Sequence, residues 1–147
     1  MTIIGRILTI GTFGLLATLA ALGQNFTPGT AQGNLTATAG SCSGTTTACV
    51  QLNVNAETAA VAFAVTGTFS ATLTFEATLD GTNWFAYSAL APGVGAATSR
   101  VYTATVATTG LWQINAAGFS AVRVRCSAYT SGTAAIYARR STGVSAP

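Results

Sequence analysis

The segment Phe69-Ser-Ala-Thr-Leu-Thr-Phe-Glu-Ala-Thr-Leu-Asp80 alternates apolar and polar residues without a break. Successive side chains of a β-strand point to opposite faces, so a period of two predicts a strand with an apolar face toward a core and a polar face toward solvent. The predicted inward residues are Phe69, Ala71, Leu73, Phe75, Ala77 and Leu79. Such alternation is typical of antiparallel sheets.

A reversal is predicted directly after this strand, at Asp80-Gly81-Thr82-Asn83. Glycine adopts positive φ without strain, and Asp and Asn side chains accept hydrogen bonds from the backbone of the turn. We therefore expect residues 84–90 to return beside the first strand as a β-hairpin.

Short apolar-polar alternations recur along the chain and are separated by turns rich in glycine. Eight candidate strands cover residues 50–54, 61–65, 69–79, 84–90, 101–106, 111–115, 121–129 and 134–138. No stretch has the 3.6-residue period of an amphipathic helix, so the pattern predicts an all-β fold: a single antiparallel β-sandwich that is jelly-roll-like. We expect this domain at 49–140, a Gly/Thr/Ala-rich linker or surface loop at 24–48, and a C-terminal tail at 141–147.

The N-terminal segment, residues 1–23, differs in composition from the rest of the chain. After Arg6 it is almost entirely apolar, and its apolar residues begin with Ile3 and end with Leu22. A short basic start, an apolar stretch and the small residues around Leu22 are typical of a signal peptide, with Gln24 as the first mature residue. Two alternatives remain open: an uncleaved membrane anchor, since the length suits a bilayer, and an apolar assembly arm buried against partner subunits.

Charged residues make up only 6% of the chain, and the net charge of +3 comes from six arginines against three acidic residues. A general nucleic-acid-binding protein carries far more lysine and arginine. The composition therefore argues against specific nucleic-acid binding.

The residues needed for common catalytic sites are missing. Without histidine or lysine, no side chain of the usual kind can activate a serine, threonine or cysteine nucleophile. Glu76 and Asp80 lie about 13 Å apart along an extended strand, too far for two carboxylates to cooperate in glycoside hydrolysis. Three cysteines without histidine make a zinc site improbable. We expect no enzyme activity, no metal and no cofactor.

The three cysteines fall into two groups. Cys42 and Cys49 bracket a short, flexible loop, so we expect a disulfide between them. Cys126 occupies an inward position of a predicted strand, where a thiol usually behaves as a small buried apolar group.

The last two candidate strands predict a hairpin with a three-residue loop at 131–133. This register sets Arg125 opposite Arg139, and like charges across a sheet repel. Pairing with Glu76 or Asp80 would relieve the repulsion, as would an acidic partner or solvent screening. The candidate assembly or ligand contacts are Arg123, Arg125, Arg139, Tyr129 and Tyr137.

A set of motifs between residues 50 and 140 carries a family resemblance. The runs are Gly67-Thr-Phe-Ser-Ala-Thr-Leu-Thr-Phe-Glu76, Asp80-Gly-Thr-Asn-Trp-Phe-Ala86, Gly118-Phe-Ser-Ala-Val-Arg-Val-Arg125 and Tyr129-Thr-Ser-Gly-Thr-Ala134. Together they resemble a small β-sandwich domain that recurs in structural and accessory proteins of tailed bacteriophages. A weaker resemblance is to discoidin-like, galactose-binding sandwiches.

The phage resemblance implies a non-enzymatic virion protein, such as a capsid decoration, fibre or tail-associated component. It would pack against other virion proteins or copies of itself as an oligomer. The second resemblance implies a secreted or surface-anchored module that binds a glycan. Under either alternative, the segment from Ile3 to Leu22 is a candidate for contact with a membrane.

Overall fold

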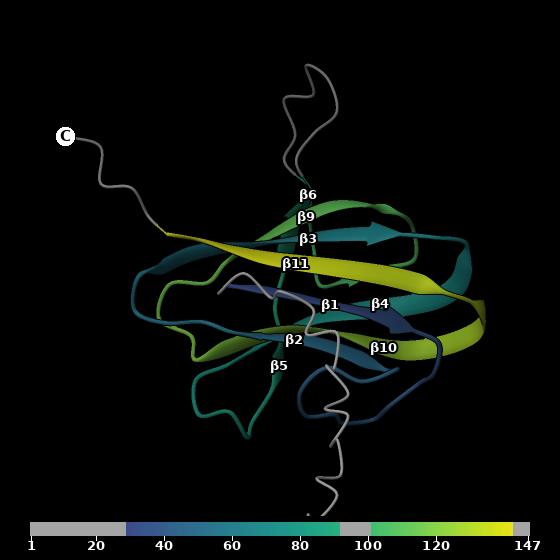
Figure 1. The fold of residues 1–147 in the computed structure, drawn as a ribbon, viewed down its shortest axis with the longest axis horizontal. Coiled ribbons are helices and arrows are strands. Elements are labelled where there is room, and N and C mark those ends of the chain that lie inside the picture. Colours follow the sequence, from purple (N-terminus) through teal and green to yellow (C-terminus); the bar gives the residue numbers. More distant parts are fainter. Residues whose placement is uncertain (1–28, 92–100, 143–147) are drawn as a thin grey trace, which may run out of the picture.

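The computed structural model describes residues 29–91 and 101–142, and these form a β-sandwich of two antiparallel sheets (Figure 1). The strands are β1 (Thr30–Leu35), β2 (Cys49–Asn53), β3 (Thr58–Thr66), β4 (Phe69–Thr78), β5 (Phe85–Ala86), β6 (Ala89–Ala91), β7 (Val101–Thr103), β8 (Thr105–Val106), β9 (Gly110–Asn115), β10 (Ala121–Gly132) and β11 (Ala134–Thr142). The predicted all-β sandwich is confirmed.

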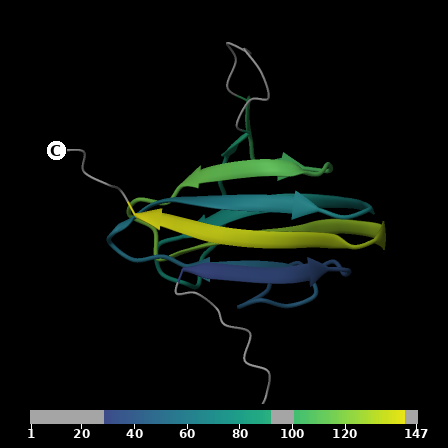
Figure 2. The same ribbon diagram turned by 45° about the horizontal axis from the view of Figure 1, so that its top comes forward.

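The connections between the long strands switch from one sheet to the other. Sheet A has the order β1-β11-β3-β9-β6-β7, and sheet B has the order β2-β10-β4-β5, with β8 also paired to β4. The chain therefore passes from sheet A to sheet B and back as it runs through β1, β2, β3 and β4, and again through β9, β10 and β11, which is the arrangement of a jelly roll. Figure 2 shows β11 and β3 side by side in sheet A.

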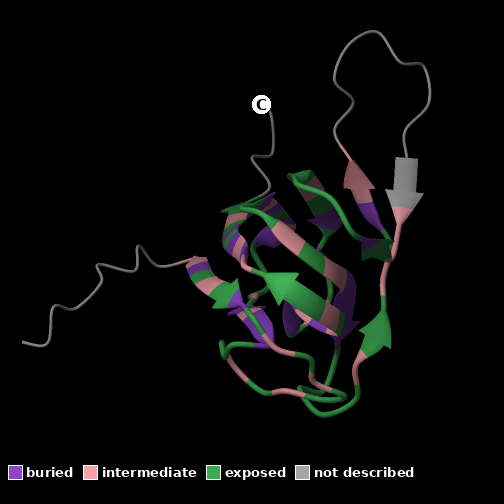
Figure 3. Cartoon of the chain, turned by 90° about the vertical axis from the view of Figure 1, so that its right-hand side faces the viewer, coloured by how far each residue is buried: buried purple, intermediate pink, exposed green. Residues whose placement is uncertain are grey.

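The core lies between the two sheets and follows the predicted alternation. Leu73, Phe75 and Ala77 of β4 are buried, and the Phe75 ring contacts Phe63 and Trp112 of the facing sheet, with ring centroids 5.6 and 5.8 Å apart. Buried and exposed residues alternate along many of the strands (Figure 3). Trp112 is partly buried and packs against this core.

Two features of the first predicted hairpin differ from the expectation. The reversal is present, with Gly81 at φ 75° and β5 antiparallel to β4, but only residues 85–86 pair with β4, and the chain then crosses to sheet A. Leu79, predicted to face inward, is 72% exposed and directly follows the last residue of β4.

The predicted hairpin of the last two strands is wrong. β10 lies in sheet B between β2 and β4, whereas β11 lies in sheet A between β1 and β3. Arg125 is therefore opposite Thr74 and Cys49, and Arg139 is opposite Ala62 and Thr30. Alternation determines which face of each strand is buried, but it does not determine the neighbouring strand. The same side chains are buried whether the two strands are paired in one sheet or lie in opposite sheets across the core.

The ends of the domain also differ from the prediction. β1 falls within residues 24–48, where a linker or surface loop was expected, and β11 extends to Thr142. The segment from Ile3 to Leu22 lies outside the described residues. In the described ranges, no helix has the length and hydropathy needed to cross a membrane.

Candidate interaction surface

The outer face of sheet B is closed by an ion-pair cluster centred on Glu76. Its carboxylate accepts hydrogen bonds from Arg123 Nε at 2.6 Å and from Arg125 Nη2 at 2.7 Å. All three residues come from neighbouring positions of β4 and β10, since Glu76 is directly opposite Arg123. Arg123 is only 3% exposed.

The loop at residues 36–48 covers this cluster. The Arg123 guanidinium donates to the carbonyl oxygen of Cys42, and Arg125 Nη1 donates to the carbonyl oxygen of Ala39 at 2.9 Å. A disulfide joins Cys42 to Cys49, whose Cα atoms are 6.3 Å apart. On the other side of Arg123, its guanidinium carbon lies 4.0 Å from the ring centre of Trp84. Trp84 thus packs on Arg123 at the outer face of sheet B.

Glu76 is ionised because of its two partners. Burial alone would raise the pKa of this carboxyl, but the hydrogen bonds and positive charges of Arg125 and Arg123 outweigh burial and hold the pKa below its usual range. Intramolecular pairing with Glu76 is therefore what occupies Arg123 and Arg125. Asp80 does not take part in any ion pair among the described residues.

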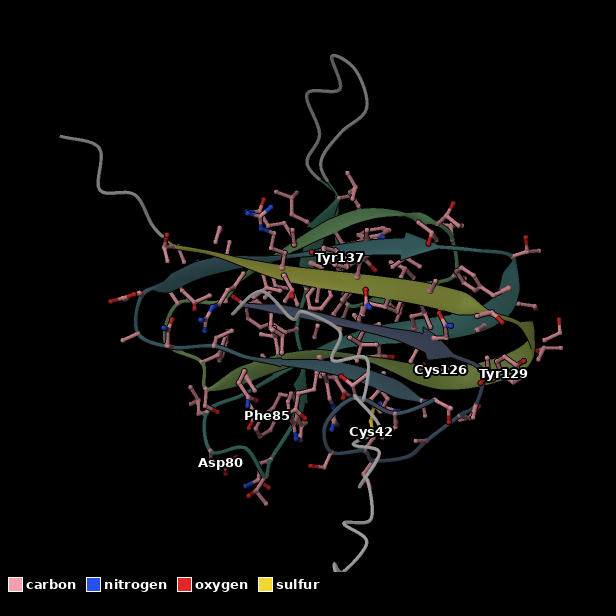
Figure 4. All side chains as sticks on the ribbon, viewed as in Figure 1. Cys42, Asp80, Phe85, Cys126, Tyr129 and Tyr137 are labelled. Carbon is pink, nitrogen blue, oxygen red and sulfur yellow. A yellow bond between two sulfur atoms is a disulfide. The ribbon has the colours of Figure 1, made fainter. Side chains whose placement is uncertain are left out.

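The two predicted tyrosine contacts lie in different surroundings (Figure 4). Register shifts in β10 between Cys126 and Ala128 and after Tyr129 change the alternation. As a result Tyr129, expected to face outward, packs partly against the core, and its hydroxyl donates to the Gly132 carbonyl oxygen at 2.9 Å. Tyr137 is 46% exposed on the outer face of sheet A.

The outer face of sheet A is open along its centre. The register places Gln32, Tyr137, Ala64 and Leu111 in one row across four strands, and Arg139, Ala62, Gln113 and Leu90 in the next row. Small side chains of β3 at Ala60, Ala62 and Ala64 therefore run between larger ones of β11 and β9. We use the name alanine trough for these three alanines of β3 together with the larger side chains on either side. The latter are its walls: Tyr137, Arg139, Leu111 and Gln113.

Two hollows lie at the ends of the alanine trough. One, of about 400 Å³, is lined by Ala64, Thr66, Ala135, Tyr137 and parts of β1. The other, of about 700 Å³, is lined by Ala60, Leu90, Gln113, Asn115 and the link between β5 and β6. No acidic residue takes part in the rows of this face, and Arg139 is its charged member.

A second exposed apolar feature lies at the turn between β4 and β5. Leu79 and Phe85 are 72% and 70% exposed, the highest values among the exposed large hydrophobic residues of the described chain. We name Leu79, Asp80 and Phe85 the turn knob. The sequence pattern did not predict this feature, because Leu79 continues the alternation of the strand and was expected to face inward. Its position directly before the turn at Asp80-Gly81 was the signal that could have indicated exposure.

Hydrogen bonds within the turn hold the knob in one conformation. Asp80 Oδ1 accepts from the backbone N–H groups of Asn83 at 2.7 Å and Thr82 at 2.9 Å, and Asp80 Oδ2 accepts from Asn83 Nδ2 at 2.6 Å. These bonds hold the pKa of Asp80 well below its usual range. The knob therefore carries a negative charge beside its apolar side chains at neutral pH.

The thiol and the possible metal ligands of the described residues can be located as well. Cys126 is the free thiol of the described residues and is buried, and burial raises its pKa, which makes it a poor nucleophile. Within residues 29–91 and 101–142, no group of three or more potential metal ligands from His, Cys, Asp and Glu comes together.

Comparisons with known proteins give a fold and no family. No family model and no curated protein matches the chain. The crystal structure of SPBc2 prophage-derived protein YomS is similar, with a TM-score of 0.54 and 14% sequence identity over 76% of this chain and 93% of that one. At this identity the likeness shows a shared fold. It agrees with the resemblance to bacteriophage sandwiches and gives no support to the discoidin-like one.

Proposed function

We propose that this chain is a non-enzymatic structural component of a bacteriophage particle and that it packs against other proteins through the alanine trough of sheet A. The observation that carries the proposal is the contrast between the two outer faces. On sheet B, Thr74, Glu76 and Arg123 are buried, and the chain's own loop and ion pairs hold Arg123 and Glu76. On sheet A, Leu111 and Tyr137 stay 62% and 46% exposed.

The chemistry of the trough suits protein packing. Apart from Arg139, its walls combine the apolar Leu111 and Tyr137 with the amide of Gln113, and uncharged groups lose less on leaving water than ions do. Cores of protein interfaces are depleted in charge and enriched in aromatic residues, which fits Tyr137 at the wall. The fold shared with a prophage-derived protein supports a phage setting, and a decoration, fibre or tail-associated position is part of the proposal.

The proposal is tested by incorporation into particles. Ala62→Glu places a charge at the centre of the trough without touching the core, since Ala62 is exposed. We expect the wild-type protein at fixed copy number in purified virions and a strong reduction for Ala62→Glu. Ala128→Glu is the matched control, because Ala128 is exposed on sheet B. Equal incorporation of the three proteins, or absence of the wild type from virions, contradicts the proposal.

A carbohydrate-binding module is the second candidate, favoured by the larger hollow. This hollow is lined by Gln113, Asn115 and Tyr87. In a carbohydrate-binding module, the two side-chain amides would hydrogen-bond sugar hydroxyls and the tyrosine ring would stack on a sugar ring. Such a module would be secreted or held at a cell surface. A glycan array that is positive for the wild type and negative for Gln113→Ala supports this function over the first.

The location of the protein is decided by its N-terminus. Mass spectrometry of the native protein distinguishes a chain that begins at Met1, as an assembly arm or anchor requires, from one that begins at Gln24, as export requires. A Gln24 start in a glycan-binding protein would favour the second candidate.

A further inference from the structure

We infer that the turn knob of one copy docks in the alanine trough of a second copy, so that the chain associates through two different surfaces. This deepens the proposed function and rests on it, because it names a second copy as the partner of sheet A.

The two surfaces match in polarity. The knob presents Leu79 and Phe85, which are apolar and largely exposed. The trough is lined by alanines and bordered by Leu111 and Leu90. Small residues beneath exposed larger ones leave room for side chains from a partner, and burying two such side chains supplies favourable apolar contact.

The two surfaces also match in charge. Asp80 extends the knob with a carboxylate that has no cation partner among the described residues, and Arg139 stands beside Ala62 with no carboxylate partner in the same ranges. Of the other acidic residues, Glu76 is neutralised within sheet B and Glu57 lies in the turn between β2 and β3. Charges of opposite sign at the rim orient the docking of apolar groups.

The turn that carries the knob has a fixed conformation before binding, unlike a flexible loop. It is fixed by Asp80, Thr78 and Asn83, so little conformational freedom is lost on binding. Figure 4 shows Asp80 and Phe85 at the lower left of the molecule, well separated from Tyr137 over sheet A. A contact between two separate patches of one chain is heterologous and, when repeated, builds rings or filaments, which suits the proposed particle component.

A mixing experiment with the full chain tests the inference. The knob variant is Leu79→Ser with Phe85→Ser, and the trough variant is Ala62→Glu. Sedimentation at concentrations up to millimolar should show self-association of the wild type, and each variant alone should weaken it by about tenfold or more. Mixed at equal concentration, the two variants should form a heterodimer, because one intact knob then meets one intact trough.

Controls separate this contact from its rivals. Ala128→Glu should associate like the wild type, and unchanged circular dichroism spectra and melting temperatures show that all variants are folded. A wild type that stays monomeric overturns the inference. The inference is also overturned if the trough variant alone fails to associate and the knob variant alone associates normally, since that pattern means that sheet A pairs with itself.

The same variants separate this inference from the proposed function. If Ala62→Glu fails to enter particles while the knob variant enters normally, sheet A binds a different virion protein. The proposed function then stands and the knob-to-trough contact is wrong.

Discussion

Glu76 of β4 accepts a hydrogen bond from Arg123 of β10, directly opposite, on a face of sheet B that is buried by the chain itself. An arginine that reads as an exposed contact in the sequence is therefore part of the fold. Among the described residues, the outer face of sheet A lacks such a cover and becomes the candidate for function.

Removing the carboxylate should destabilise the domain. Glu76→Gln leaves the buried Arg123 and the half-buried Arg125 without a counter-charge, and breaking a buried ion pair from one side costs about 3 kcal/mol or more. Urea denaturation should show a loss of this size in the free energy of unfolding. Glu57→Gln is the control, because Glu57 is exposed, and should change stability by about 0.5 kcal/mol at most. Equal effects of the two substitutions would contradict the cluster.

The same pair of variants predicts a pH dependence. The pKa of Glu76 in the folded protein lies below its ordinary value of 4.5. At pH values between these two pKa values, the folded state therefore binds fewer protons than the unfolded state. The stability from Glu76 is then complete above about pH 4.5 and is lost as the pH falls through the lower, folded pKa. The gap in unfolding free energy between wild type and Glu76→Gln should narrow on acidification. A gap independent of pH would mean that Glu76 is not ionised in the cluster.

Thiol chemistry should separate the three cysteines. With Cys42 bonded to Cys49 and Cys126 buried, alkylation under native, non-reducing conditions should label no cysteine. Denaturation without reductant should expose one thiol, measured by mass. Reduction should lower stability by about 2 to 3 kcal/mol through the entropy of the short loop. Three thiols after denaturation alone would remove the disulfide.

Gly81 is expected to be sensitive to substitution through its backbone. Its φ of 75° is strained for other residues, although a Cβ there would meet no atom within 4 Å. Gly81→Val should therefore lower the free energy of unfolding by about 1 to 3 kcal/mol. Gly40→Val provides the comparison, since Gly40 has open space and no positive φ, and its melting temperature should stay near that of the wild type. Similar melting temperatures for both variants would show that the turn is drawn wrongly.

The sequence predicted which residues are buried better than which strands are neighbours. Leu73, Phe75 and Cys126 are in the core as their alternation indicated, and Gly81 reverses the chain as expected. The hairpin between β10 and β11 was wrong because two inward-facing strands bury the same side chains whether they lie side by side or across the core.

Of the candidate contacts, Tyr137 and Arg139 lie on the outer face of sheet A, and their role as contacts stays a prediction. For Arg123 and Arg125 the structure shows the alternative of pairing with Glu76. Their enclosure was missed, because polarity along a strand does not reveal that a distant loop covers it. The sequence pattern also missed the turn knob and the alanine trough, since alanine reads as neutral in any periodic pattern.

The sequence alone determined the all-β class, the inward faces of the strands and the reversal at Asp80-Gly81, because these depend on local alternation and on backbone conformations that single residues favour. Only the tertiary structure decided the partner of each strand, the enclosure of Glu76 with its two arginines, and the face left open. Those features depend on contacts between residues far apart in the chain, as between Glu76 and Arg123, and the energy of such contacts is not encoded in any one segment.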